Sequence, residues 1–173
     1  MVKFTLKNTG TFKSLLQKMS KNLPEAVIKF AKDKITLFGM DDRNILAGKL
    51  IIPRQYFKYS SYEPIKNIGV RTSDLCTFFR RLKGDVTLSV EGKKLVLSAK
   101  HKKFGLGILR LGNRHDYKKR KPIVSWDTGG RIEGIKRIYM WLNKGPLVIT
   151  SVQDGYELSW IIAPNIVTHK KRK

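Results

Sequence analysis

Apolar residues recur at helical spacing in two separate segments of the chain. Between Thr11 and Leu23 they fall at positions i, i+3, i+4, i+7 and i+11, which is the spacing of one buried helix face. A second helix is predicted at Ser73–Lys83, with Thr72 or Ser73 as its N-cap. It repeats the same face 63 positions later. The matched residues are Phe12, Leu15, Leu16 and Met19 in the first segment and Leu75, Phe78, Phe79 and Leu82 in the second.

Short apolar runs with strand character surround each predicted helix in the same order. One run precedes each helix and three follow it, so the chain contains two copies of a strand-helix-strand-strand-strand unit. A helix with one apolar face needs a sheet to cover, and the sequence therefore predicts an α+β fold with helices on one face of antiparallel sheets. The predicted strands are Phe4–Lys7, Ala26–Phe30, Lys34–Phe38 and Ile45–Ile52 in the first copy, and Asn67–Val70, Val86–Val90, Leu95–Ala99 and Gly105–Leu111 in the second.

A third, partial copy of the unit is expected toward the C-terminus. A strand at Ile123–Trp126 precedes a predicted helix at Arg131–Asn143, and a hairpin then turns at Asp154-Gly155. The stripe of this third helix is Ile132, Ile135, Ile138, Tyr139 and Leu142, and the hairpin strands are Pro146–Val152 and Tyr156–Ile162. The predicted organisation is a two-repeat domain at 1–111, a basic linker at 112–122, a partial repeat at 123–167 and a basic tail at 168–173.

The net charge of the chain indicates an anionic binding partner. The sequence has 36 Lys and Arg against 13 Asp and Glu, a formal net charge of +23. Self-repulsion on that scale destabilises a compact state, and such an excess is typical of proteins that bind nucleic acid, an anionic membrane or an acidic protein. No apolar stretch reaches the roughly 18 residues of a spanning helix, and the N-terminus lacks a signal-peptide core, so no membrane partner is expected.

The residue types that carry catalysis and metal binding are not grouped in the sequence. Asp41 and Asp42 are adjacent in a predicted turn, where two carboxylates do not converge on one atom. Gly105-Leu106-Gly107 lies in a strand-like run, not before a helix, so it is not a phosphate loop. We therefore expect no enzyme activity, no metal and no cofactor. His101, His115 and His169 are scattered, and the single cysteine, Cys76, is expected to be a buried thiol in a reducing, intracellular compartment.

Three segments of this chain resemble the sliding clamp family, proliferating cell nuclear antigen (PCNA) and its archaeal relatives. The first is Phe4-Thr5-Leu6-Lys7 running into the helix that starts near Phe12. The second, Ile35-Thr36-Leu37-Phe38-Gly39-Met40-Asp41-Asp42, is similar to the family's isoleucine-x-leucine-x-alanine-methionine-aspartate segment. The third, Ser159-Trp160-Ile161-Ile162-Ala163-Pro164-Asn165-Ile166, is similar to its closing strand. Residues 1–111 match the family's N-terminal domain in length and order.

The resemblance implies a DNA-clamp fold in which helices face duplex DNA and sheets form the outside. It implies sequence-independent duplex DNA binding and a role as a polymerase processivity factor in DNA replication, as in archaeal and viral clamps. DNA polymerase and other replication proteins would be partners. Phosphate contacts suit sliding, because they carry affinity without sequence information. The candidate DNA-binding residues on the exposed helix faces are Lys13, Lys18, Lys21, Arg80, Arg81, Lys83, Lys136 and Arg137.

The resemblance also implies a partner-peptide pocket, and it leaves the assembly open. The residues that match the pocket are Met40, Ile45, Ile161 and Pro164, although the linker lacks the apolar residues that help to build it in the family. Residues 122–167 match only about half of the family's C-terminal domain, so one repeat is missing. The chain would then either close a ring of non-standard stoichiometry, such as four subunits, or bind DNA as a monomer, as in herpesvirus processivity factors.

Two other nucleic-acid functions remain open from the residues alone. An aromatic and basic segment contains Tyr56, Phe57, Tyr59 and Tyr62 with Arg54 and Lys58, and it would stack bases if its rings were exposed. Packing of these rings back on the sheet is the alternative. Exposed rings would predict a protein that binds single-stranded nucleic acid. A clamp fold used as an architectural protein that coats DNA is the other alternative.

Overall fold

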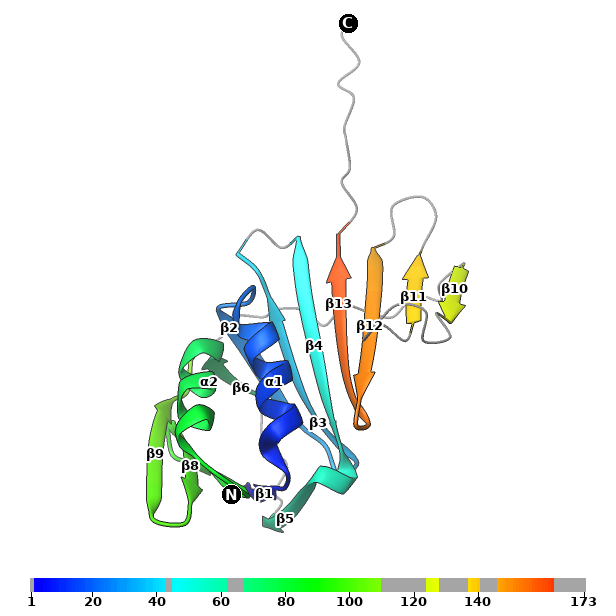
Figure 1. Ribbon diagram of the computed structural model, residues 1–173. Coiled ribbons are helices and arrows are strands. Elements are labelled where there is room, and N and C mark those ends of the chain that lie inside the picture. The colour runs from blue at the N-terminus through cyan, green and yellow to red at the C-terminus, as the bar shows by residue number, and fades with distance from the viewer. Residues whose placement is uncertain are drawn as a thin grey trace, which may run out of the picture.

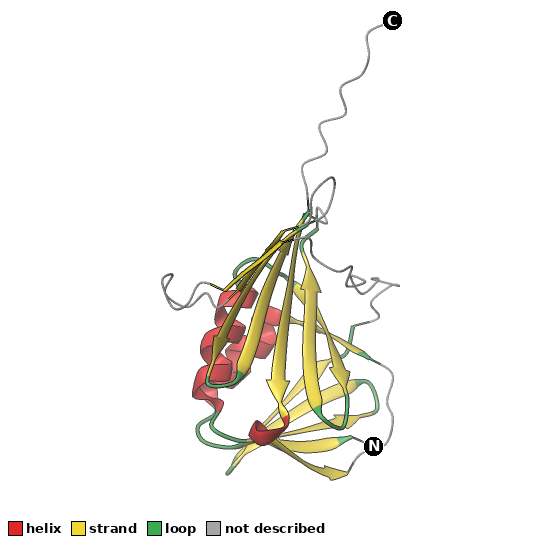
Figure 2. Cartoon of the chain, turned by 90° about the vertical axis from the view of Figure 1, so that its right-hand side faces the viewer, coloured by secondary structure: helices red, strands yellow, loops and turns green. Residues whose placement is uncertain are grey.

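The computed structural model describes residues 2–42, 45–61, 67–109, 124–127, 137–140 and 146–163. Within these ranges the chain forms two antiparallel sheets and two α-helices. Both helices lie on the same side of the sheets (Figure 1), and a view turned by 90° shows the sheets diverging beside them (Figure 2). The predicted α+β class, with helices on one face of antiparallel sheets, is confirmed.

The two predicted helices are present and bury the expected faces. Helix α1 spans Thr9–Ser20 and α2 spans Thr72–Arg81. They pack against each other through Phe12 and Phe79, whose ring centroids are 4.8 Å apart in an edge-on arrangement. The apolar stripe that repeats 63 positions apart is therefore the surface through which the helices meet each other and the sheets. Its fully buried members are Phe12, Leu15, Leu16, Met19, Leu75, Phe79 and Leu82.

The start of α2 differs from the expected N-cap. Arg71 occupies the cap position, and Thr72 is the first helical residue. The Thr72 hydroxyl donates to the carbonyl oxygens of Leu23 and Pro24, in the segment that follows α1. The Thr72 backbone N–H also donates to the Pro24 carbonyl, at 3.0 Å. Its hydroxyl therefore joins the second repeat to the first and does not cap its own helix.

The two repeats exchange their first strands. The first strand of the chain, β1, lies in a five-stranded sheet in the order β5-β1-β7-β8-β9, between β5 and the strands of the second repeat. Reciprocally, β6 pairs with β2 of the first repeat. Residues of both sheets and both helices, with Tyr156 and Leu158 of β13 among them, form one hydrophobic core. The bounds are β1 Lys3–Leu6, β2 Glu25–Phe30, β3 Lys34–Met40, β4 Leu46–Pro53, β5 Phe57–Ser61, β6 Ile68–Arg71, β7 Val86–Glu91, β8 Lys94–Ala99 and β9 Lys102–Gly107.

The C-terminal residues extend the first repeat's sheet to eight strands, in the order β10-β11-β12-β13-β4-β3-β2-β6. The predicted helix at Arg131–Asn143 is wrong over Arg137–Met140, which form a strand paired on both sides, while the rest of that range lies outside the described residues. The predicted hairpin is confirmed, and Asp154 and Gly155 take positive φ angles of 50° and 79° at its turn, as a tight type I′-like turn requires. The four strands are β10 Val124–Asp127, β11 Arg137–Met140, β12 Leu147–Gln153 and β13 Tyr156–Ile162.

A pair of glycines allows the end of α1 to pack closely on the larger sheet. Gly39 and Gly48 lie opposite each other on β3 and β4. A Cβ atom at Gly48 would lie 2.6 Å from Leu23 Cδ1 and 3.1 Å from the Trp160 ring. Leu23, three residues after the end of α1, and Trp160, on β13, therefore occupy the space that side chains at the two glycines would fill. This contact ties the helix, the first repeat and the C-terminal hairpin together.

Candidate nucleic-acid interface

Most of the predicted DNA-binding cations of the two helices lie on their exposed sides. Lys18 lies on α1 and Lys21 follows that helix. Arg80 and Arg81 end α2, and Lys83 lies two residues beyond its end. All five are exposed. Helices α1 and α2 lie side by side on one side of the sheets (Figure 2), and the five cations occupy exposed positions of these two helices or of the residues that follow them. The structure thus brings together five of the eight predicted residues on one helical surface, named here the helix face.

The helix face has a strong excess of positive charge. Residues 9–23 carry three cations and no carboxylate. Residues 72–85 carry three cations and only two carboxylates, Asp74 in the first turn of α2 and Asp85 beyond its end. Among the described residues neither carboxylate forms an ion pair with a helix-face cation. The positive potential of this face is therefore not neutralised locally, and it is free to act on an external polyanion.

Lys13 plays a different part from the other predicted cations. It is half-buried, and its ammonium donates a 2.6 Å hydrogen bond to the Leu82 carbonyl oxygen at the C-terminal end of α2. Burial lowers the pKa of Lys13 below its ordinary value. A cation at this end of a helix interacts favourably with the helix dipole. Lys13 therefore helps to join the two helices, in addition to contributing charge to the helix face.

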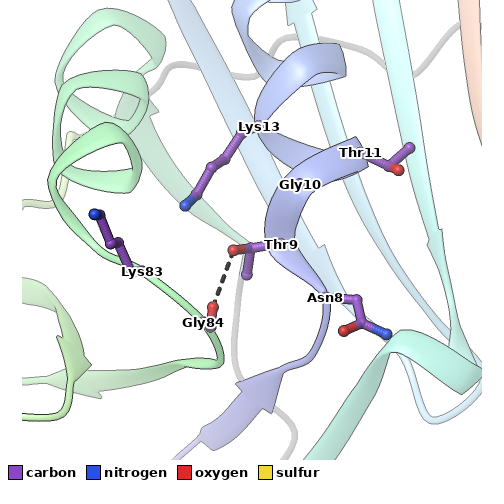
Figure 3. A pocket seen from close by; sticks show the side chains of 7 residues that line it. All are labelled: Asn8, Thr9, Gly10, Thr11, Lys13, Lys83 and Gly84. Carbon is purple, nitrogen blue, oxygen red and sulfur yellow. Dashed lines mark hydrogen bonds between the residues drawn. The ribbon is translucent and has the colours of Figure 1, made fainter.

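An open pocket with a volume of about 510 Å³ lies where the start of α1 meets the end of α2. Figure 3 shows Lys13 reaching across it from α1, with Lys83 beyond, and the Thr9 hydroxyl donating to the Gly84 carbonyl at 3.0 Å. Helix α1 has no acidic residue in its first turn. The pocket is consequently a positively charged recess on the helix face. Its lining residues are Asn8, Thr9, Gly10, Thr11, Lys13, Lys83 and Gly84.

The two remaining predicted DNA-binding residues are not on a helix in the described part of the chain. Arg137 begins β11, where it pairs with Asp127 of β10 and Thr150 of β12. Lys136 lies outside the described residues. The expectation that both belong to the exposed face of a third helix is therefore wrong for Arg137, because that expectation rested on a helix that the chain replaces with a strand.

The residues expected to form a partner-peptide pocket lie on the opposite, outer face of the larger sheet. Ala47 is paired with Met40 on one side and with Ile161 on the other, which places the three side chains in one row across β3, β4 and β13. Ile45, two residues before Ala47, lies beside this row and is 50% exposed. Pro164 lies outside the described residues. The structure therefore brings Met40, Ile45 and Ile161 together on one apolar surface, named here the outer apolar row.

The aromatic segment between the repeats does not present its rings for stacking. Phe57 is buried, and it packs against the half-buried Tyr59, which in turn donates a 3.0 Å hydrogen bond to the Ala31 carbonyl. Tyr56 packs on Tyr156, with ring centroids 4.5 Å apart. Tyr62 lies outside the described residues. The segment predicted as a connection instead forms a short 3-10 turn at Arg54–Tyr56 followed by β5, and its described aromatic residues lie in the core or pack against it.

The other singled-out residues have structural roles. The Asp41 carboxylate accepts hydrogen bonds from the backbone N–H groups of Ile45 and Leu46, at 2.8 and 2.9 Å, as expected of a turn. Cys76 is buried, and Gly105-Leu106-Gly107 lies within β9. Within the described ranges, no three His, Cys, Asp or Glu side chains group as metal ligands. No helix there is long and apolar enough to cross a membrane.

A second group of lysines is brought together only by the order of the strands. Lys3, Lys58, Lys94 and Lys103 lie on the face of the five-stranded sheet that points away from the helices. The signal is the period-two alternation of Lys3-Phe4-Thr5-Leu6, in which Phe4 and Leu6 face the core and the intervening residues face out. A single strand shows this alternation, but only the sheet order shows that lysines of four strands share one face.

Comparison with known proteins identifies the fold. No family model and no curated protein matches the sequence. Among solved structures, PCNA from Entamoeba histolytica is similar with a TM-score of 0.73 and 11% identity over 95% of this chain and 98% of that one. PCNA from Thermococcus kodakaraensis is similar with a TM-score of 0.71 and 12% identity, over 95% of this chain and 100% of that one. PCNA from A. fulgidus, bound to the C-terminal region of FEN-1, is similar with a TM-score of 0.74 and 12% identity, over 96% of this chain and 99% of that one. The chain thus has the fold of the PCNA sliding clamps.

Proposed function

We propose that the protein is a non-catalytic, sliding-clamp-like processivity factor that binds duplex DNA without regard to sequence. The observation that carries the proposal is the helix face, where Lys18, Lys21, Arg80, Arg81 and Lys83 gather on one side of a clamp fold. Long cationic side chains on parallel elements contact phosphates and carry no base information. They exchange phosphate partners as the protein moves along the duplex, which suits a sliding role.

The packing of the aromatic segment supports duplex over single-stranded DNA as the ligand. A single-strand binder stacks bases on exposed aromatic rings. The three described rings of that segment pack into the core or on one another instead. We therefore expect binding to be governed by phosphate charge, with a preference for duplex and little dependence on sequence.

Charge removal from the helix face tests this function. The variant Lys18→Gln, Lys21→Gln, Arg80→Gln, Arg81→Gln removes four exposed cations, and titration with a fluorescent duplex at several salt concentrations reports the effect. We expect affinity to fall by at least tenfold, and the slope of log K against log salt to become shallower by about 3 to 4. Stimulation of a polymerase from the same organism should fall in parallel.

The control is a pair of exposed lysines where β2 turns into β3, Lys32 and Lys34, outside both helices. The variant Lys32→Gln, Lys34→Gln should lose less than threefold in affinity. If the helix-face variant bound as tightly as the unchanged protein, or if single strands bound more tightly than duplex, the proposed function would be wrong.

The outer apolar row supports peptide docking as a second part of this function. The A. fulgidus PCNA structure contains the C-terminal region of FEN-1, and we propose that a replication protein's peptide binds this chain along Met40, Ala47 and Ile161. Ile45 is the residue to change, because it is exposed and its loss costs the fold little. A labelled FEN-1 C-terminal peptide should bind the unchanged protein and lose at least tenfold in affinity to Ile45→Asp. Equal binding to both would refute this surface.

Light scattering addresses the assembly that the sequence leaves open. Because +23 is a large charge for a protein that threading alone would retain, we propose that the chain binds DNA as a monomer. The expected mass is then close to the 19.9 kDa of one chain. A mass above about twice that value, with or without duplex, would contradict the monomer and favour a ring.

A further inference from the structure

The outer face of the five-stranded sheet is built as a row of hydroxyls between lysines. One row of register partners runs through all five strands, from Lys58 on β5 to Lys103 on β9. Between these lysines the row holds Thr5, Thr87 and Ser98. With strands about 4.8 Å apart, the row extends over about 19 Å.

The next two rows each add one lysine to the same face. Lys3 pairs in register with Ser61 and Ser89. Lys94 reaches over the adjacent strand, since a Cβ atom at Gly105 would lie 3.7 Å from its Cδ. The stem of Lys94 thus rests on the sheet while its ammonium stays in solvent, as long cationic side chains commonly do. We call Lys3, Lys58, Lys94 and Lys103, with the hydroxyls between them, the outer basic face.

The charge of this face is nearly unopposed among the described residues. The one carboxylate on it is Glu91, which lies 3.7 Å from the Lys103 ammonium and also accepts a 2.8 Å hydrogen bond from Ser89. Lys3, Lys58 and Lys94 form no ion pair within the described part of the chain. The Thr5 and Thr87 hydroxyls are 3.0 Å apart and hydrogen-bond each other, which leaves one hydroxyl proton of that pair for an outside acceptor.

The chemistry of the face favours a phosphate backbone over exposed bases or an apolar protein surface. Lysine ammonium groups and Ser or Thr hydroxyls are typical donors to phosphate oxygens. Every aromatic residue of β1, β5 and β9 alternates to the other face or packs in the core, so this face offers no ring on which a base would stack. The shared features of the face are therefore positive charge, hydroxyl donors and flatness.

From this arrangement we propose that the outer basic face is a second duplex DNA-binding surface, so that one molecule bridges two duplex segments. The helices pack on the inner side of the same sheet, where Phe78 of α2 stacks on Phe104 of β9 at 5.1 Å. The outer basic face consequently points away from the helix face, and the hydrophobic core separates the two. A duplex bound to one face leaves the other accessible. This inference goes beyond the proposed clamp function, which uses the helix face alone.

A bridging assay tests the proposal with two variants of equal net charge. One is the helix-face variant described above, and the other is Lys3→Gln, Lys58→Gln, Lys94→Gln, Lys103→Gln. Each removes four cations. Protein is added to a duplex fixed on beads, and capture of a second, fluorescent duplex is measured beside simple binding of one duplex. We expect the outer-face variant to bind one duplex within threefold of the unchanged protein and to lose at least 80% of the bridging.

The other outcomes separate the two proposals. Bridging by the outer-face variant at the level of the unchanged protein overturns the second surface. Loss of bridging in both variants is expected, because bridging needs both faces. Equal losses of affinity for a single duplex in the two variants would overturn the proposal, because they would reflect net charge and not location. Full duplex binding by the helix-face variant would instead refute the proposed clamp function and leave the outer basic face standing. If poly-glutamate displaced the captured second duplex and free duplex did not, the face would be assigned to an acidic protein and the proposal would be overturned.

Self-association of the protein would also bridge two duplexes, and light scattering on the same samples shows whether it occurs. A monomeric mass together with bridging supports two surfaces on one chain. Bridging only by a dimeric fraction, with both duplexes lost in the helix-face variant, contradicts the proposal, because two helix faces of a dimer would then be sufficient.

Discussion

The Lys13 ammonium lies 2.6 Å from the Leu82 carbonyl oxygen, so a cation of the first helix closes the end of the second. The same junction is held by the Thr9 hydroxyl, which donates to the Gly84 carbonyl at 3.0 Å. At the other end of the helix pair, Thr72 bonds the segment after α1 in the reciprocal way. The first turn of each helix is thus attached to the segment that follows the other helix, which fixes the spacing of the cations on the helix face.

Removing the Lys13 ammonium should therefore cost stability as well as charge. We expect Lys13→Met to lower the free energy of unfolding by about 1 kcal/mol, because it removes a charged hydrogen bond at a helix C-terminus while retaining the aliphatic stem. Urea unfolding followed by tryptophan fluorescence measures this loss. Lys18→Met is the matched control, because Lys18 is exposed and makes no such bond in the described structure. Equal stability of the two variants would show that Lys13 contributes charge alone.

Thr72→Val should destabilise the junction at the opposite end of the helices. Valine keeps the shape of threonine but leaves the carbonyl oxygens of Leu23 and Pro24 without the Thr72 hydroxyl. Because Thr72 is fully buried, we expect a loss of about 1 to 3 kcal/mol in the free energy of unfolding. Thr77→Val provides the comparison, since the exposed Thr77 hydroxyl only bonds the Ser73 carbonyl of its own helix. A loss at Thr77 as large as that at Thr72 would argue against the junction.

The glycine pair under Leu23 predicts a third difference in stability. Gly48→Ala would place a Cβ atom 2.6 Å from Leu23 Cδ1 and force the end of α1 away from the sheet. We expect a loss of about 1 to 3 kcal/mol, typical of overpacking in a core. Gly107→Ala, on a strand where a Cβ atom meets nothing within 4 Å, should be neutral or slightly stabilising. Thermal unfolding of the two variants side by side decides whether packing or strand glycine content controls stability here.

Much of the first two repeats follows from local sequence, while the pairing of their strands does not. The 3.6-residue stripe around Phe12 and its copy around Phe79 predicted both helices correctly, because each buries one face against a sheet. Period-two alternation predicted the strands. It contains no information about which sheet a strand joins, so the exchange of β1 and β6 between the repeats could not be foreseen.

The C-terminal error has a similar physical origin. The apolar residues around Ile138 fit a helical stripe, yet Arg137–Met140 lie between two strands that supply backbone partners on both sides. Pairing with neighbours overrides a weak local preference in such a segment. The candidate site was predictable to the same extent: exposed cations on helices followed from periodicity. The outer basic face depends on strand order, and the structural role of Lys13 depends on a contact with a distant residue.

The buried Tyr156 hydroxyl predicts a substitution that removes a polar group without loss of stability. Tyr156 is fully buried, and its hydroxyl has no hydrogen-bond partner among the described residues. Tyr156→Phe should therefore equal or exceed the unchanged protein in stability by up to about 1 to 3 kcal/mol at neutral pH, since an unsatisfied buried hydroxyl is costly. Tyr59→Phe is the contrast, because it removes the 3.0 Å hydrogen bond to the Ala31 carbonyl and should lose about 1 kcal/mol.

Alkaline pH should enlarge the difference between Tyr156→Phe and the unchanged protein. Burial, and secondly the nearby Tyr56 and Asp154, raise the pKa of Tyr156 far above its ordinary value of 10.0. Above pH 10 the unfolded chain releases this proton while the folded chain retains it, so the unchanged protein loses about 1.4 kcal/mol of stability for each further pH unit from this group. The Tyr156→Phe variant does not lose this stability, because phenylalanine has no proton to release. Urea midpoints of both proteins between pH 8 and about 11 measure it, and a constant difference across that range would show that the hydroxyl ionises normally in the folded state.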